Sequence, residues 1–162
     1  MPVEAARPAT DADLDALRAL FAAAAADLAE ARGADVYFAR EAPVPSREEL
    51  RKSLDALDSC VLVGTLDDQI VGGGVASTEP LRDGRILGVI RVLHVDRDAR
   101  EVGVGEELLR GLVAWCASRG AVAVDSLALP GERATKNFYE AAGFKARLLT
   151  VHHRLDERDP HD

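Results

Sequence analysis

The sequence predicts a single-domain mixed α/β protein in which helices cover one sheet, and two observations carry this prediction. The 162 residues are 48% apolar and 30% charged, which fits one globular domain with room for a hydrophobic core. The apolar pattern along the chain changes repeatedly between the period of a strand and that of a helix. The resulting order is strand, two helices, three strands, helix, strand, helix, strand, which is typical of a mixed sheet with helices on it.

The chain is expected to open with a short strand and a long helix. The strand spans 3–7 and is closed by Pro8, and Thr10 or Asp11 can cap the helix that follows. Gly33 is expected to end this helix. The apolar positions of the helix recur at helical spacing, and they are Leu14, Leu17, Leu20, Phe21 and Leu28.

The next segment, 34–45, contains two prolines and two aromatic residues and is predicted to form a loop. Ser46, with Glu49 three residues later, then forms a capping box. This motif predicts a second helix over 47–57.

The middle of the chain is predicted to form three consecutive strands. Residues 60–66 and 69–78 are rich in branched side chains and are joined by Asp67 and Asp68, which predicts a hairpin. Residues 86–95 are almost continuously apolar, as in a strand that is buried on both faces.

A helix and a strand are expected after this apolar run. The helix covers 105–118, carries its apolar residues on one side and stops at Gly120. A strand follows at 121–129, and Pro130 with Gly131 predicts a turn.

The end of the chain is expected to add one more helix and one more strand. The helix covers 132–142 and is ended by Gly143, and the strand covers 145–155. The domain is therefore expected to span 1–155, with 156–162 as a disordered polar tail.

Charge and cysteine content limit the classes of function. The net charge of -8 argues against nonspecific nucleic-acid binding and against docking on an anionic membrane, because both need a basic surface. Cys60 and Cys116 are expected to be buried, reduced thiols rather than a disulfide. The N-terminus has acids where a signal peptide is basic, and the apolar run 19–26 is far short of the roughly 20 residues of a membrane span. A cytoplasmic location is therefore expected.

Arg100, Gly103 and Gly105 lie at the start of the helix over 105–118. A helix N-terminus leaves backbone N–H groups unpaired and attracts anions. Glycines let a phosphate approach the backbone, and Arg100 can add a charge-assisted contact. These residues predict a phosphate-binding site, with a simple turn as the alternative. No Gly-Lys-Ser/Thr triplet occurs, and the polar stretch 96–102 separates strand from helix, so neither a P-loop nor a Rossmann fingerprint fits.

The stretch VDRDAREVGVGEELL, residues 95–109, resembles the Q/R-x-x-G-x-G/A acyl-CoA loop of the GNAT superfamily of N-acetyltransferases. Three further stretches resemble family segments in the family's order: RPATDADLDAL, VLVGTLDDQIVGGGVA and NFYEAAGF. The resemblance covers about 3–155. It implies a mostly antiparallel sheet of six to seven strands with four helices, and a V-shaped splay between the fourth and fifth strands.

The resemblance also implies that acetyl-CoA lies in this splay. In the family, the pantetheine arm pairs with the backbone of the fourth strand, and the pyrophosphate lies on the amides that precede the next helix. The implied cofactor-binding residues are Leu93, His94, Val95, Arg100, Glu101, Val102, Gly103, Val104 and Gly105. No metal is expected.

The implied mechanism is direct transfer, in which an amine attacks the acetyl thioester and a general acid protonates the leaving thiolate. Tyr139 matches the family position that gives this proton, and a phenol can do so without being charged at rest. Without the resemblance, Tyr139 would be interpreted as a half-buried helix tyrosine bonded to a carbonyl.

The sequence does not place a general base on the cofactor strand. Relatives often carry a carboxylate at the positions of Val89 or Arg91, and neither is acidic here. Glu79 and Asp125 are the nearest alternatives, and His94 could relay a proton. Water can also take the proton, so a base is not required.

The resemblance places the acceptor site at Tyr37, Phe38, Arg40 and Glu41, with Arg91 reaching its floor. A surface loop with two anchoring aromatic residues is the alternative. We expect an acetyl-CoA-dependent N-acetyltransferase that acts on a primary amine of a small molecule. A catalytically silent acyl-CoA-binding sensor or regulatory module and a protein N-acetyltransferase are the other hypotheses. Relatives are often dimers, so a homodimer is one expectation.

Overall fold

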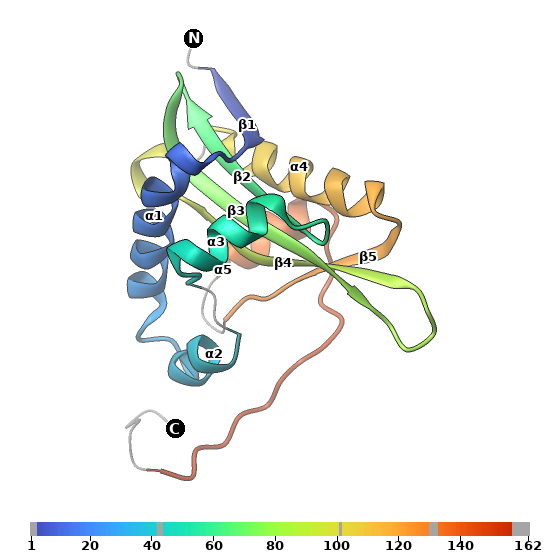
Figure 1. Cartoon of the computed structure of the whole chain (residues 1–162). Coiled ribbons are helices and arrows are strands. Elements are labelled where there is room, and N and C mark those ends of the chain that lie inside the picture. Colours follow the sequence, from blue (N-terminus) through green and yellow to red (C-terminus); the bar gives the residue numbers. More distant parts are fainter. Residues whose placement is uncertain (1–2, 42–43, 101, 130–132, 157–162) are drawn as a thin grey trace.

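Five strands form one sheet in the order β1-β2-β3-β4-β5, and helices lie on both of its faces (Figure 1). The structure is a computed structural model that describes residues 3–41, 44–100, 102–129 and 133–156. The strands are β1 (Glu4–Pro8), β2 (Ser59–Leu66), β3 (Gln69–Pro80), β4 (Ile86–Val95) and β5 (Ala121–Ser126). The helices are α1 (Leu14–Leu28), α2 (Ala34–Glu41), α3 (Arg47–Asp55), α4 (Val104–Ser118) and α5 (Arg133–Ala141), with short 3-10 helices η1 (Asp11–Asp13) and η2 (Arg97–Ala99).

The sheet is mixed, as predicted. Strands β1 to β4 pair antiparallel, whereas β5 pairs parallel with β4 after the crossover through α4. The β2–β3 hairpin turns at Asp67 and Asp68, whose φ angles of 49° and 66° suit a tight two-residue turn. This confirms the predicted hairpin.

The β4–β5 ladder stops before β4 ends. Its last pair joins Ile90 to Ser126, and β4 continues to Val95. Over residues 92–95, β4 is paired with β3 on one side only. The predicted divergence of the fourth and fifth strands is therefore seen at this point.

Buried side chains form two clusters on opposite faces of the sheet. One cluster joins α1 and α3 to the sheet through Leu14, Leu17, Phe21, Leu50, Val61, Val63 and Val75. The other joins α4 to the sheet through Leu62, Ala76, Ile90, Val104, Leu108, Leu109, Leu112 and Cys116. Neighbouring residues of β2 alternate between the clusters, because successive strand side chains point to opposite faces. The predicted apolar faces of α1 and α4 are thus the buried ones.

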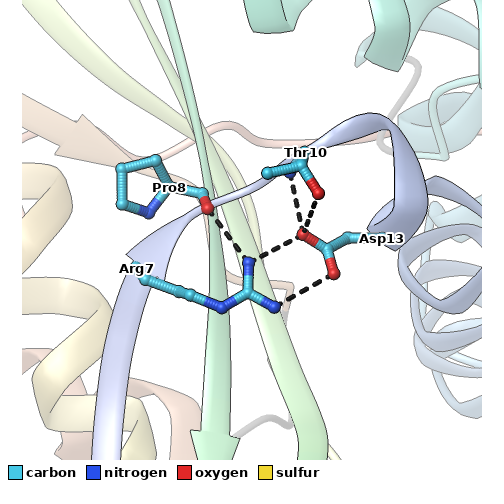
Figure 2. A network of polar contacts seen from close by, with 4 residues as sticks. All are labelled: Arg7, Pro8, Thr10 and Asp13. Atoms are coloured by element: carbon cyan, nitrogen blue, oxygen red, sulfur yellow. Dashed lines mark hydrogen bonds and ion pairs between the residues drawn. The ribbon is translucent and has the colours of Figure 1, made fainter.

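An ion pair fixes the turn from β1 into α1 (Figure 2). Arg7 Nη1 donates to Asp13 Oδ2 at 2.8 Å, and Nη2 donates to Oδ1 at 3.1 Å. The backbone N–H of Thr10 donates to the same carboxylate at 2.8 Å. The Arg7 guanidinium and these hydrogen bonds hold the pKa of Asp13 at about 2, although the residue is only 5% exposed. Thr10 is therefore the N-cap of η1, which continues directly into α1, and this network sets the direction in which α1 leaves the sheet.

Residues 34–41 form helix α2, so the prediction of a loop over 34–45 was wrong. The helix follows Gly33, which has a φ of 72°, and the N–H of Tyr37 donates to the Gly33 carbonyl at 2.9 Å. The rings of Tyr37 and Phe38 pack edge to face with centroids 5.4 Å apart. The prolines that suggested a loop lie at 43 and 45, after the helix has ended.

No strand forms over 145–155, so the prediction of a last strand was wrong. The chain after α5 is extended and runs from beside β5 toward the start of α2 (Figure 1, red). Arg147 pairs with Asp125 at one end, and Arg154 Nη1 donates to Asp35 Oδ1 at 2.8 Å at the other. Strand-forming side chains need a neighbouring strand and a covered face, and no described strand pairs with this segment.

The described residues thus form five strands and five helices, where six to seven strands and four helices were predicted. The Pro130–Gly131 turn and the tail beyond Asp156 lie outside the described residues.

Both cysteines are free thiols that contact the cluster beneath α4. Cys116 is fully buried, and burial raises the pKa of the partly buried Cys60 to about 11. Within the described part of the chain, none of the helices is long and apolar enough to cross a membrane.

Candidate active site

A cleft of about 520 Å³ opens where β4 and β5 diverge. It runs from the first turn of α4, along the end of β4, to α1 and α2, and α5 closes one side. This volume is in the range of small-molecule sites. The residues proposed from the sequence that line it are Tyr37, Phe38, Arg91, Leu93, His94, Val95, Arg100, Gly105 and Tyr139. The fold therefore brings the two predicted substrate aromatics and the predicted proton donor into one cavity.

Of the described residues of the predicted phosphate loop, Arg100 and Gly105 alone line the cleft. Val102, Gly103 and Val104 do not line it, and Glu101 lies outside the described residues. Gly103 is the N-cap of α4 with a φ of 95°, a conformation that favours glycine. A Cβ at Gly105 would lie 3.3 Å from the Phe138 ring, so this glycine also allows α5 to approach α4. Sequence reasoning had assigned Gly105 to phosphate access and missed this contact.

Arg100 connects the loop to the end of β4. Its Nε donates to the carbonyl of Val95 at 3.1 Å. The two terminal nitrogens make no hydrogen bond to the described residues, while the side chain lines the cleft. Arg100 therefore presents positive charge to a ligand beside the α4 N-terminus.

Tyr139 lies at the point where the two strands separate. Its ring packs against Phe138 and Phe144, with centroid distances of 5.4 Å and 5.2 Å. Burial raises the pKa of its hydroxyl, while an interaction with the Ser126 side chain opposes this. Ser126 is the last residue of the β4–β5 ladder. The phenol is therefore neutral at pH 7 and faces the mouth of the divergence.

His94 is a neutral imidazole in the same cleft. Burial, and then the positive charge of Arg100, lower its pKa below the usual value, while Asp96 and Asp27 partly oppose this. No hydrogen bond or ion pair joins its ring to the other residues that the structure describes. The sequence suggests a backbone contact for His94, with a proton relay as the alternative, and the structure places its neutral ring in the cleft, where it can accept a proton.

Comparison with known proteins identifies the family. A model of the acetyltransferase (GNAT) family matches residues 20–144, which run from within α1 to just past the end of α5. The chain belongs to the GNAT family of acetyltransferases. Among curated proteins, no sequence matches this chain.

Solved structures share this GNAT fold at low sequence identity. A tetramutant of the protein BH1408 from Bacillus halodurans is 20% identical with a TM-score of 0.78, and the similarity covers 93% of this chain and 99% of that one. An aminoglycoside acetyltransferase from an uncultured soil metagenomic sample, in complex with trehalose, is 21% identical with a TM-score of 0.68 over 94% and 97% of the chains. AAC(6')-Iy, in complex with the bisubstrate analogue CoA-S-monomethyl-acetylneamine, is 17% identical with a TM-score of 0.70 over 95% and 99%.

The two carboxylates considered as bases lie outside the GNAT cleft. Glu79 accepts a hydrogen bond from Arg91 Nη2 at 2.5 Å, and Asp125 pairs with Arg147. Neither lines the cavity. Arg91 lines it, but its guanidinium is held at the rim by Glu79 and by Ser77, whose Oγ accepts from Nε at 2.8 Å. These contacts explain why neither acid is placed to take a proton from a ligand.

The far end of the cleft adds residues that the sequence did not single out. Ala24 and Ala25 of α1 line it one turn after the buried Phe21. Their side chains carry no reactive group, so no catalytic or binding motif in the sequence includes them. The available signal was the helical spacing from Phe21, which places both alanines near the same face.

Proposed function

We propose that this GNAT protein is an acetyl-CoA-dependent N-acetyltransferase that acetylates a primary amine of a small molecule. The observation that carries the proposal is that one cleft is lined by the α4 N-terminal turn, by the end of β4 beyond its pairing with β5, and by Tyr139. The proposal treats 1–155 as one acetyltransferase domain, acting in the cytoplasm as a monomer or a homodimer.

The residues at the α4 end fit an acyl-CoA. The backbone of Leu93, His94 and Val95 belongs to the part of β4 that no longer pairs with β5, which suits the amides of a pantetheine arm. The α4 N-terminus and Arg100 suit a pyrophosphate. We assign these groups, with the amides of 101–105, to acetyl-CoA. The complex of AAC(6')-Iy with a CoA-containing analogue, on the same fold, supports the assignment.

Tyr139 and His94 have complementary parts in the proposed reaction. Acetyl-CoA would supply an activated acetyl thioester. The amine nitrogen bonds to the acetyl carbon, the carbon–sulfur bond breaks, and Tyr139 donates its proton to the sulfur, before regaining a proton from solvent. A raised pKa keeps this phenol protonated until the thiolate forms. The neutral His94, or water, accepts the proton that the amine loses.

A calorimetric titration tests the cofactor assignment. Acetyl-CoA should bind with micromolar affinity, and binding should collapse for free pantetheine, which lacks the pyrophosphate. Dephospho-CoA, which keeps the pyrophosphate, is the matched control and should bind nearly as well. Absence of acetyl-CoA binding below millimolar concentration would overturn the proposal.

A catalytically silent acyl-CoA sensor is the second candidate, and the absence of a carboxylate at Val89 and Arg91 motivates it. The two candidates differ in turnover rather than in binding. Release of free thiol from acetyl-CoA in the presence of an amine identifies the enzyme. Binding without thiol release from any amine identifies the sensor.

A further inference from the structure

The end of the cleft away from α4 is walled mainly by apolar and aromatic side chains. One face of α1 lines this end with Ala24, Ala25 and Leu28, and α2 lines it with Tyr37 and Phe38. All five are half-buried rather than exposed. The two alanines leave space opposite the aromatic rings, so an apolar group of a ligand has room and contacts on both sides.

This wall lies beside the proposed proton donor. Tyr37 and Tyr139 line the same cleft, and Tyr37 is close enough to contribute to the raised pKa of Tyr139. Burial also raises the pKa of Tyr37, which indicates a poorly hydrated site. An amine that reaches Tyr139 can therefore place the rest of its molecule against Tyr37 and Phe38.

Among the residues that the structure describes, this end of the cleft has no unpaired carboxylate that could bind a second ammonium group. Among the described lining residues the acids are Asp27 and Glu106. Asp27 Oδ1 pairs with Arg97 at 3.4 Å, and Glu106 lies in the first turn of α4, at the opposite end. An ammonium group without a partner is costly to remove from water, so a polycation is disfavoured here.

The acids of α2 do not change this balance. Glu41 is near enough to raise the pKa of Tyr37, but it pairs with Arg40 at 3.4 Å and does not line the cleft. Asp35 is bound by Arg154. Of the three arginines that line the cleft, Arg91 pairs with Glu79 and Arg97 with Asp27, so only Arg100 adds a positive charge, which repels a polycation.

We infer that the acceptor is a monoamine carried on an apolar or aromatic body, and that polyamines and aminoglycosides are poor substrates. The inference rests on the proposed function and specifies its substrate class. Affinity for the body comes from the apolar α1 face and the two α2 aromatics, whereas the single amine is directed to Tyr139 and His94.

A matched pair of amines tests the inference. Hexylamine and cadaverine have the same number of heavy atoms and differ in one terminal group, a methyl in one and an ammonium in the other. We expect kcat/KM for hexylamine to exceed that for cadaverine on the order of 100-fold, because only the methyl is compatible with the apolar wall. Phenethylamine should be at least as good as hexylamine, and neamine should be poor. Direct titration of both matched amines into the CoA-bound protein gives the same comparison without turnover.

Two substitutions test the wall itself. Phe38→Ala should lower kcat/KM for phenethylamine by about 10- to 100-fold and leave the KM for acetyl-CoA unchanged. Val36→Ala is the control, because Val36 is an exposed α2 residue that does not line the cleft. Ala25→Asp adds a carboxylate to the apolar wall. This variant should have more similar kcat/KM values for hexylamine and cadaverine than the wild type has.

The outcomes separate the two proposals. Equal or better turnover of cadaverine or neamine would overturn the substrate class and leave the acetyltransferase proposal intact. Failure to acetylate hexylamine and phenethylamine, together with no binding of either amine to the CoA-bound protein, would overturn the substrate class alone. Absence of acetyl-CoA binding would overturn both proposals.

Discussion

The two ends of the cleft are built from different parts of the polypeptide. The end at α4, proposed to bind acetyl-CoA, uses backbone groups of β4 and of a glycine-containing loop. The opposite end, proposed to bind the amine and called the acceptor end below, uses side chains of α1 and α2. A site built from backbone changes only when the course of the chain changes, but a site built from side chains changes with each substitution. Cofactor binding should therefore depend on glycine conformation, and the choice of amine on individual side chains.

The largest effect is expected at Tyr139, which lies between the two ends. Tyr139→Phe should lower kcat by about 100- to 10,000-fold, because the thiolate loses its proton donor. Affinity for acetyl-CoA should stay the same. Thiol release measures the first quantity and calorimetry the second. Asn137→Ala, an exposed position on the same helix, is the control. An unchanged kcat in Tyr139→Phe would contradict the proposed role.

The next largest effect is expected on stability, at Asp13, which fixes the start of α1 and so the helix that lines the acceptor end. The pKa of Asp13 is lowered from 3.8 to about 2 in the folded protein, so its ionised form stabilises the fold above pH 3.8, and this stabilisation disappears as pH falls toward 2. Asp13→Asn should lower the free energy of unfolding by about 2 kcal/mol at pH 7. Urea unfolding at several pH values measures this.

A matched carboxylate controls for a general charge effect. Asp15 is 83% exposed and pairs with Arg47 at the surface, so Asp15→Asn should cost less than about 1 kcal/mol. If the free energies of unfolding of Asp13→Asn and the wild type differed as much near pH 2 as at pH 7, the stabilisation would not come from the ionised carboxylate.

A smaller effect, on affinity for acetyl-CoA, is expected at Gly103, where the α4 end depends on backbone conformation. Gly103→Val forces a branched residue to a φ of 95°, which costs about 1–3 kcal/mol and displaces the first turn of α4. Affinity for acetyl-CoA should fall about tenfold. Gly84→Val is the matched control, because Gly84 has a φ of 87° and does not line the cleft. Equal loss of affinity in both variants would show that strain alone is responsible.

The smallest effect is expected for the two acids outside the cleft. Glu79→Gln and Asp125→Asn each remove one surface ion pair, so kcat/KM should change by less than about twofold. Steady-state kinetics with a varied amine and saturating acetyl-CoA measures this. A loss of tenfold or more in either variant would identify that carboxylate as the base and remove the role proposed for His94.

Local sequence signals predicted the elements that local chemistry determines. The Ser46–Glu49 capping box opens α3, the Asp67–Asp68 turn closes the hairpin, and β4 has the predicted bounds. Each signal acts within a few residues. The same holds for Gly103, whose positive φ at the N-cap of α4 agrees with the glycine found there.

The two wrong predictions concern segments whose structure depends on distant neighbours. Residues 34–41 have aromatic and branched side chains typical of strands or loops, and their helix is stabilised by packing of Tyr37 and Phe38 beside the cleft. Residues 145–155 have strand-forming side chains but no neighbouring strand. Leu148 and Val151 are 78% and 87% exposed. Ala24 and Ala25 were not predicted for a related reason, because only the packing of α1 beside α2 and β4 makes them line the cleft.

The sheet edge left open beyond Ile90 has a thermodynamic consequence. Any ligand whose amides pair with residues 91–95 acts as an additional strand, and it binds only the folded chain. Folding and cofactor supply are then linked, since a ligand at 100 times its Kd adds about 2.7 kcal/mol to the free energy of unfolding. The resistance of this protein to heat and to proteases would then rise and fall with the concentration of acyl-CoA around it.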